Sequence, residues 1–208
     1  MLVYVAVAAL GYAYGVPWNI GLVIQPGQVL NEGALIPGLV AQGEAWRLIS
    51  SVFLHSGVVH LGFNMLSLYF LGSFVEAAFG RGRFFALYLL SGISGGMAYL
   101  YFGAFGAPAV GASGAIFGIL GALFVLERRG TIASGGQIAG LIVINLIITF
   151  ALSSFISVGA HVGGLIGGVI VMFLMVRFRR SAALAIAAAT VVTAAALLLS
   201  YWQARGYT

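Results

Sequence analysis

Two short stretches of the chain each place one reactive side chain among small residues. Residues 110–119 read VGASGAIFGI and contain Ser113, and residues 158–168 read VGAHVGGLIGG and contain His161. A serine hydroxyl becomes a nucleophile when an adjacent base accepts its proton, and histidine is the usual base. If the two segments touch, this pair predicts nucleophilic acyl transfer. Taken singly, each residue also has a structural interpretation, because small and polar residues both serve helix packing.

The glycines in these stretches have the spacing of a helix contact. Gly114 and Gly118 form one GxxxG pattern, and Gly164 and Gly168 form a second. Small residues at this spacing let two helix backbones approach closely within a membrane. We therefore expect the two segments to be helices in close contact, so that the serine and the histidine meet.

A second polar pair could assist the same chemistry. His60 and Asn64 are four residues apart, so both project from one face of a helix. An imidazole N–H, an amide N–H and the backbone N–H of Ser113 at a helix start suit an oxyanion hole. The alternative is a polar pair that only ties its helix to the neighbouring helices.

Composition indicates where these helices lie. The chain has 208 residues, of which 62% are hydrophobic and 6% are charged. A soluble domain carries about a quarter charged residues. We therefore expect an all-α polytopic membrane protein whose surroundings are the lipid bilayer. The net charge of +5 is too sparse for a nucleic-acid partner.

The charged residues exclude several chemistries. All nine basic residues are arginine, and the four acids are Glu32, Glu44, Glu76 and Glu127. Without Asp, Lys or Cys the chain has no Ser-His-Asp triad, Ser-Lys dyad, cysteine nucleophile or disulfide. Three histidines without Cys or Asp form no zinc ligand set, so we expect neither a metal nor a cofactor.

Long apolar runs predict seven spanning helices, since a span needs about 20 mostly apolar residues. They lie near 1–14, 58–78, 84–103, 113–127, 137–153, 159–177 and 182–202. The first is short, and we interpret it as a helix because no basic region precedes it as in a signal peptide. Prolines interrupt residues 15–57, which we expect to form a long loop on or in the bilayer surface.

Arginines predict the orientation. Loops after the second, fourth and sixth helices hold Arg81, Arg83, Arg128, Arg129, Arg177, Arg179 and Arg180. The positive-inside rule places these loops and the amino terminus in the cytoplasm. Because the second, fourth and sixth helices then begin outside, all four candidate site residues lie toward the external face.

Four motifs in order resemble the rhomboid family of intramembrane serine proteases. They are Trp46-Arg47 in the first loop, His60 with Asn64, Gly111–Gly114 and Ala160–Gly168. The resemblance covers residues 44 to about 175. It implies a bacterial cell-membrane protein with a six-helix core over 1–178 and an additional seventh helix over 179–208.

The resemblance also implies an activity. Ser113 and His161 would form a dyad without an acid, and His60, Asn64 and the Ser113 backbone N–H would form the oxyanion hole. The reaction would hydrolyse a peptide bond in or beside a transmembrane segment of a protein substrate. Phe117 departs from the tyrosine of several bacterial members, although its ring can still stack on the histidine. The alternatives are an inactive membrane scaffold on the same fold and a small transporter.

For four further residues we expect structural roles only. We expect His55 to hydrogen-bond in the loop and Trp46 and Arg47 to anchor the loop at the bilayer interface. We expect Asn145 to form an interhelical hydrogen bond.

Overall fold

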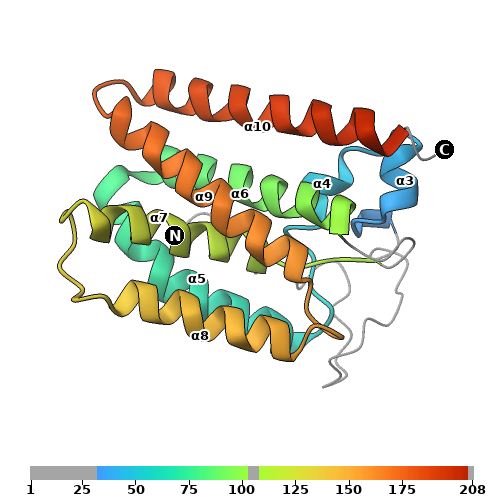
Figure 1. The fold of residues 1–208 in the computed structure, drawn as a ribbon, viewed down its shortest axis with the longest axis horizontal. Coiled ribbons are helices and arrows are strands. Elements are labelled where there is room, and N and C mark those ends of the chain that lie inside the picture. The colour runs from blue at the N-terminus through green and yellow to red at the C-terminus, as the bar shows by residue number, and fades with distance from the viewer. Residues whose placement is uncertain (1–31, 103–107, 206–208) are drawn as a thin grey trace.

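The computed structural model describes residues 32–102 and 108–205, so the helix predicted at 1–14 lies outside the described part. Within it the regular elements are helices, accompanied by an isolated antiparallel bridge between Leu35 and Ala109. The helices are α3 (Pro37–Ala41), α4 (Arg47–Ser50), α5 (Val58–Phe79), α6 (Arg81–Phe102), α7 (Ser113–Arg128), α8 (Gln137–Ala151), α9 (Val158–Arg177) and α10 (Ala182–Arg205). Helices therefore lie at all six positions where spanning helices were predicted between residues 58 and 202 (Figure 1).

The turn between α5 and α6 is tighter than the sequence indicates. We predicted that Arg81 and Arg83 lie in a loop, but only Gly80 separates the two helices. Gly80 has φ 80°, a left-handed conformation that glycine adopts at little cost. Both arginines therefore belong to the first turn of α6.

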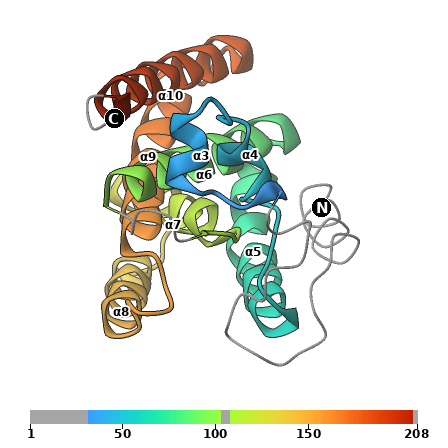
Figure 2. The same ribbon diagram turned by 90° about the vertical axis from the view of Figure 1, so that its right-hand side faces the viewer.

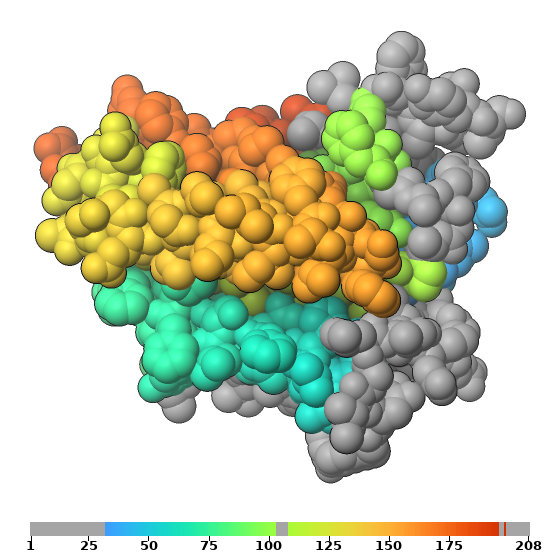
Figure 3. Space-filling view, turned by 60° about the horizontal axis from the view of Figure 1, so that its bottom comes forward, coloured from blue at the N-terminus to red at the C-terminus, as the bar shows by residue number. Residues whose placement is uncertain are grey.

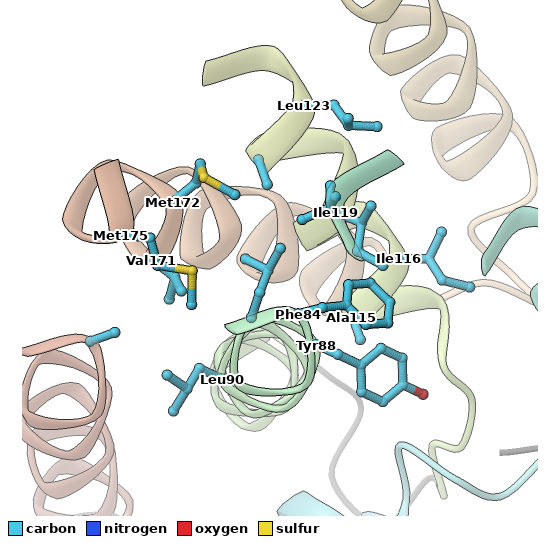
Figure 4. Packing of buried hydrophobic residues seen from close by; sticks show 14 of the residues in the cluster. Phe84, Tyr88, Leu90, Ala115, Ile116, Ile119, Leu123, Val171, Met172 and Met175 are labelled. Atoms are coloured by element: carbon cyan, nitrogen blue, oxygen red, sulfur yellow. The ribbon is translucent and has the colours of Figure 1, made fainter. Parts of the chain in front are cut away.

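Helix α7 lies in the middle of the bundle. Every residue from Gly114 to Leu123 is buried, as expected for a helix that is apolar on all sides. It contacts α5, α6, α8 and α9, which surround it in the end-on view of Figure 2. Its side chains interlock with Phe84 and Tyr88 of α6 and with Met172 of α9 in one core (Figure 4). Ser113, which begins α7, is thus followed by ten buried residues that fix the helix in the bundle.

The outer helices expose apolar side chains. On α5, Phe63, Phe70 and Phe74 are each more than half exposed. Among the described residues, α5, α6 and α9 are long and apolar enough to cross a membrane, and α8 and the first part of α10 are shorter apolar helices. An apolar surface this extensive suits lipid rather than water.

The segment before α5 folds back on the bundle. Leu35, Val40 and Leu48 pack against Met97 and Tyr99 at the end of α6. This packing explains why a loop interrupted by prolines still keeps short apolar pieces.

The prediction that Arg47 anchors the loop at the bilayer interface is wrong. Arg47 is buried, where it donates to the Ala34 carbonyl over 2.9 Å and pairs with Glu44 over 2.6 Å. A buried guanidinium needs such partners, because an unpaired buried charge is costly. Trp46 beside it is half exposed. Arg47 thus braces the loop from within.

Candidate active site

Helices α7 and α9 touch through their glycines. A methyl group added to Gly164 would overlap the carbonyl oxygen of Gly114, and one added to Gly168 would overlap that of Gly118. The two backbones are therefore in direct contact at two successive turns. This contact needs glycine at both positions of α9, since any side chain there would separate the helices.

Ser113 begins α7 beside that contact. A methyl group on Gly114, the next residue, would lie 3.2 Å from the carbonyl oxygen of Ala160, the residue before His161. The backbone N–H of Ser113 is in the first turn, where helix N–H groups have no intrahelical acceptor. The Ser113 side chain is half-buried, and its hydroxyl has no hydrogen-bond partner among the described residues. Within the described part, no other side chain or backbone group therefore holds the hydroxyl of this candidate nucleophile.

His161 lies in the first turns of α9 and is held on two sides. Its ring stacks on Phe117 with centroids 4.1 Å apart and planes 22° apart. Its Nδ1 is 2.8 Å from Oγ1 of Thr149 on α8. The Ser113 and His161 side chains form no hydrogen bond to each other here. Such bonds are often long in ligand-free sites and tighten only with substrate.

His60 faces the start of α7 from α5. A methyl group on Gly111 would lie 2.8 Å from Nε2 of His60 and 3.8 Å from Oγ of Ser113. The lack of a side chain at Gly111, which has φ 131°, keeps this gap open. The backbone N–H of Ser56 points at Nδ1 of His60 over 3.4 Å, and the Ser56 hydroxyl lies 2.9 Å from it. A backbone N–H only donates, so the contact from Ser56 is compatible with a neutral His60 that carries its proton on Nε2.

Asn64 lies one turn after His60 and is buried. Its Nδ2 donates to the backbone carbonyl of His60 over 2.8 Å. An amide nitrogen carries two hydrogens, so one N–H remains for another acceptor. The bond lies within α5 and does not tie that helix to a neighbour.

Comparison with known proteins identifies this fold. The model of the Rhomboid domain matches residues 42–178, which include every candidate site residue described above. The chain belongs to the rhomboid family. Together with its apolar helices, this membership makes it an integral multi-pass membrane protein.

The names of relatives of this rhomboid include both proteases and an inactive protein. Over 138 residues it is 46% identical to the rhomboid protease GluP of Bacillus subtilis, covering 64% of this chain and 27% of GluP. Over 143 residues it is 38% identical to the putative rhomboid protease YdcA of the same organism, covering 66% of this chain and 71% of YdcA. Over 132 residues it is 33% identical to inactive RHOMBOID-like protein 8 of Arabidopsis thaliana, covering 62% and 37%. The chain thus spans about a quarter of the length of GluP.

Three glutamates of this rhomboid have partners other than His161. Glu44 pairs with Arg47, and Glu76 lies 3.9 Å from Arg81. Glu127 accepts from the Ser134 hydroxyl and from backbone N–H groups at the start of α8. The group that faces Nδ1 of His161 is therefore a hydroxyl rather than a carboxylate.

His55 is not the loop hydrogen-bonder that we predicted. It is buried, and neither ring nitrogen has a hydrogen-bond partner of good geometry among the described residues. Burial, followed by proximity to His60, lowers the pKa of His55 to about 3, against a weaker opposing effect of the Phe53 backbone. The ring stays neutral at ordinary pH and packs edge-on against His60, with centroids 5.1 Å apart. The contact that His55 makes is thus a packing contact that supports the ring of His60.

Sequence reasoning also erred on α8. The predicted interhelical bond of Asn145 is wrong, because its Nδ2 donates to the Leu141 carbonyl of the same helix over 2.8 Å. The contact from α8 to the site comes from Thr149, which the sequence analysis missed. The available signal was a hydroxyl near the end of a mostly apolar helix.

Proposed function

We propose that this rhomboid is an intramembrane serine endopeptidase in which Ser113 is the nucleophile and His161 the base. The observation that carries the proposal is the backbone contact of α7 and α9 between Gly114 and Ala160, the neighbours of these two residues. Relatives named as rhomboid proteases at 38% and 46% identity support it.

The mechanism assigns each group a step. Oγ of Ser113 attacks the carbonyl carbon of the scissile bond while Nε2 of His161 accepts its proton. The oxyanion accepts hydrogen bonds from Nε2–H of His60, an amide N–H of Asn64 and the Ser113 backbone N–H. His161 then protonates the leaving amine, and water hydrolyses the acyl-enzyme in a second round.

The inactive scaffold is the second candidate, because one relative at 33% identity is named inactive. This rhomboid retains both a serine and a histidine at the α7–α9 contact. A small transporter instead predicts discontinuous helices near mid-membrane. In the described part, α7 and α9 are each continuous helices.

Reconstitution with substrates separates these functions. The protein would be incorporated into liposomes with a panel of single-span membrane proteins, and the products mapped by mass spectrometry. We expect cleavage in or next to a transmembrane segment. Intact substrates that co-purify with the protein would support the scaffold instead.

Gly164→Val tests whether close approach of α7 and α9 is needed. The valine side chain would push α9 outward, and a shift of about 1 Å in a reacting group can cost on the order of a hundredfold in rate. We expect a loss of that size in cleavage rate with a smaller loss of thermal stability. Gly140→Val on α8 is the control, because a methyl group there meets nothing within 4 Å. Normal turnover in Gly164→Val would show that the contact is dispensable.

We further propose a six-plus-one arrangement with a core over 1–178 and an additional helix over 179–208. The amino terminus would lie in the cytoplasm and the active site toward the external face. Helices α5, α7 and α9 all begin near the site and end near arginines, and Arg83 donates to the Arg179 carbonyl over 2.7 Å. The arginines at these helix ends thus gather at the end opposite the site.

Reporter fusions test this topology. We expect fusions after residue 130 to report a cytoplasmic location, because the adjacent arginines favour that side. Fusions after residue 107 and at the carboxyl terminus should report an external location. The inverted pattern would place the active site on the cytoplasmic side.

A further inference from the structure

We infer that Thr149 is a positioning residue that keeps the proton of neutral His161 on Nδ1, so that Nε2 is free to act as base. The inference rests on the proposed function of Ser113 and His161. It adds a third side chain to the pair, presented by α8.

Two distances determine where the protons lie. Oγ1 of Thr149 is 2.7 Å from the Asn145 carbonyl oxygen and 2.8 Å from Nδ1 of His161. Two oxygens at 2.7 Å require a proton between them, and a carbonyl has none to offer. The single hydroxyl proton of Thr149 is therefore donated to Asn145. The hydroxyl lone pairs then face Nδ1, which must carry a hydrogen.

Neutral imidazole carries one N–H, so a proton on Nδ1 leaves a lone pair on Nε2. That lone pair is what a general base needs. The arrangement provides the tautomer control that a carboxylate gives in a Ser-His-Asp triad, but without a charge. This suits a chain that has no aspartate.

The setting of Thr149 points to this role rather than to packing alone. Helix α8 is an outer helix, seen as the yellow to orange band across Figure 3. Ile138 and Thr149 are its buried residues, whereas Ile147 and Phe150 beside Thr149 are largely exposed. A helix that buries so little would gain more from an apolar side chain at that position than from a hydroxyl. With 1% exposure at Thr149, water does not compete for the bond.

The first test compares Thr149→Val with Thr149→Ser. Valine keeps the shape and removes the acceptor, so both tautomers of His161 become populated and fewer molecules hold a basic Nε2. We expect kcat to fall about five- to tenfold with little change in KM, in keeping with the loss of one hydrogen bond. Serine keeps the hydroxyl and should retain most of the activity. A loss in Thr149→Ser equal to that in Thr149→Val would overturn the inference in favour of methyl packing.

The second test reads the tautomer without relying on activity. Nitrogen NMR of ¹⁵N-histidine-labelled protein in the Ser113→Ala background reports which ring nitrogen carries hydrogen. Assignment is simple, because the chain has three histidines and His161→Ala removes one set of signals. We expect a protonated Nδ1 with threonine or serine at 149, and a tautomer mixture in Thr149→Val. Thr149→Ala is the substitute if valine disturbs α8.

The outcomes separate the two proposals. A His161 that stays protonated on Nδ1 without the hydroxyl overturns the role of Thr149, even if Ser113→Ala abolishes cleavage. Cleavage that survives Ser113→Ala overturns the proposed function, while the NMR spectra still decide whether Thr149 sets the tautomer.

Discussion

Replacing Ser113 or His161 by alanine is expected to lower kcat for a transmembrane substrate by on the order of 10⁴ or more. The serine supplies the bond-forming oxygen, and the histidine moves the proton at both stages. Because the two residues act as a unit, the double variant should be no slower than either single variant. Cleavage by reconstituted protein, with melting curves for each variant, provides the measurement.

Ser73→Ala is the matched control for loss of a hydroxyl. Ser73 lies on the exposed face of α5, where its hydroxyl donates to the Tyr69 carbonyl of the same helix. It should leave kcat unchanged. A folded Ser113→Ala or His161→Ala protein that cleaved at the wild-type rate would refute the dyad.

Asn64→Ala is expected to lower kcat by roughly a hundred- to a thousandfold, the usual cost of one oxyanion donor. The amide gives one N–H to the His60 carbonyl and has a second for the oxyanion. Since the oxyanion exists only along the reaction, kcat and kcat/KM should fall together and KM should change little. The melting temperature should stay nearly normal.

Asn145→Ala offers a close control. Asn145 makes the same bond to a carbonyl one turn earlier, over 2.8 Å, but on α8. Loss of that bond alone should leave kcat near the wild-type value. An Asn64→Ala protein that melts much earlier yet keeps a near-normal kcat would place Asn64 in the packing and outside the oxyanion hole.

Local pattern was enough to predict the helices that carry the candidate site. Long apolar runs define α5 to α10 because a span in lipid must satisfy its own backbone. The contact between Gly164 and Gly114 could also be predicted, because the spacing of small residues along each helix marks the face that touches its neighbour.

The hydrogen-bond partners of individual side chains could not be predicted, because they depend on how the helices pack together. Thr149 is twelve residues from His161 and on another helix. A threonine in a helix usually bonds the carbonyl one turn earlier, as Thr149 also does with Asn145, so the sequence gives no sign of the second partner. Asn145 shows the opposite error, since we predicted a partner on another helix and it bonds within α8. Arg47 was assigned to the bilayer interface and His55 to a loop hydrogen bond, yet both are buried by a loop whose fold is set by long-range packing.

The proposed pairing of Ser113 with His161 is tested most sharply by identifying the residue that a fluorophosphonate probe modifies. Such probes react with a serine that an adjacent base activates, so labelling followed by peptide mass spectrometry reads out the nucleophile itself. We expect an adduct on Ser113 of the native protein, much slower labelling in His161→Ala and none at position 113 in Ser113→Ala. An adduct on a different serine, or equal labelling of native and heat-denatured protein, would contradict it.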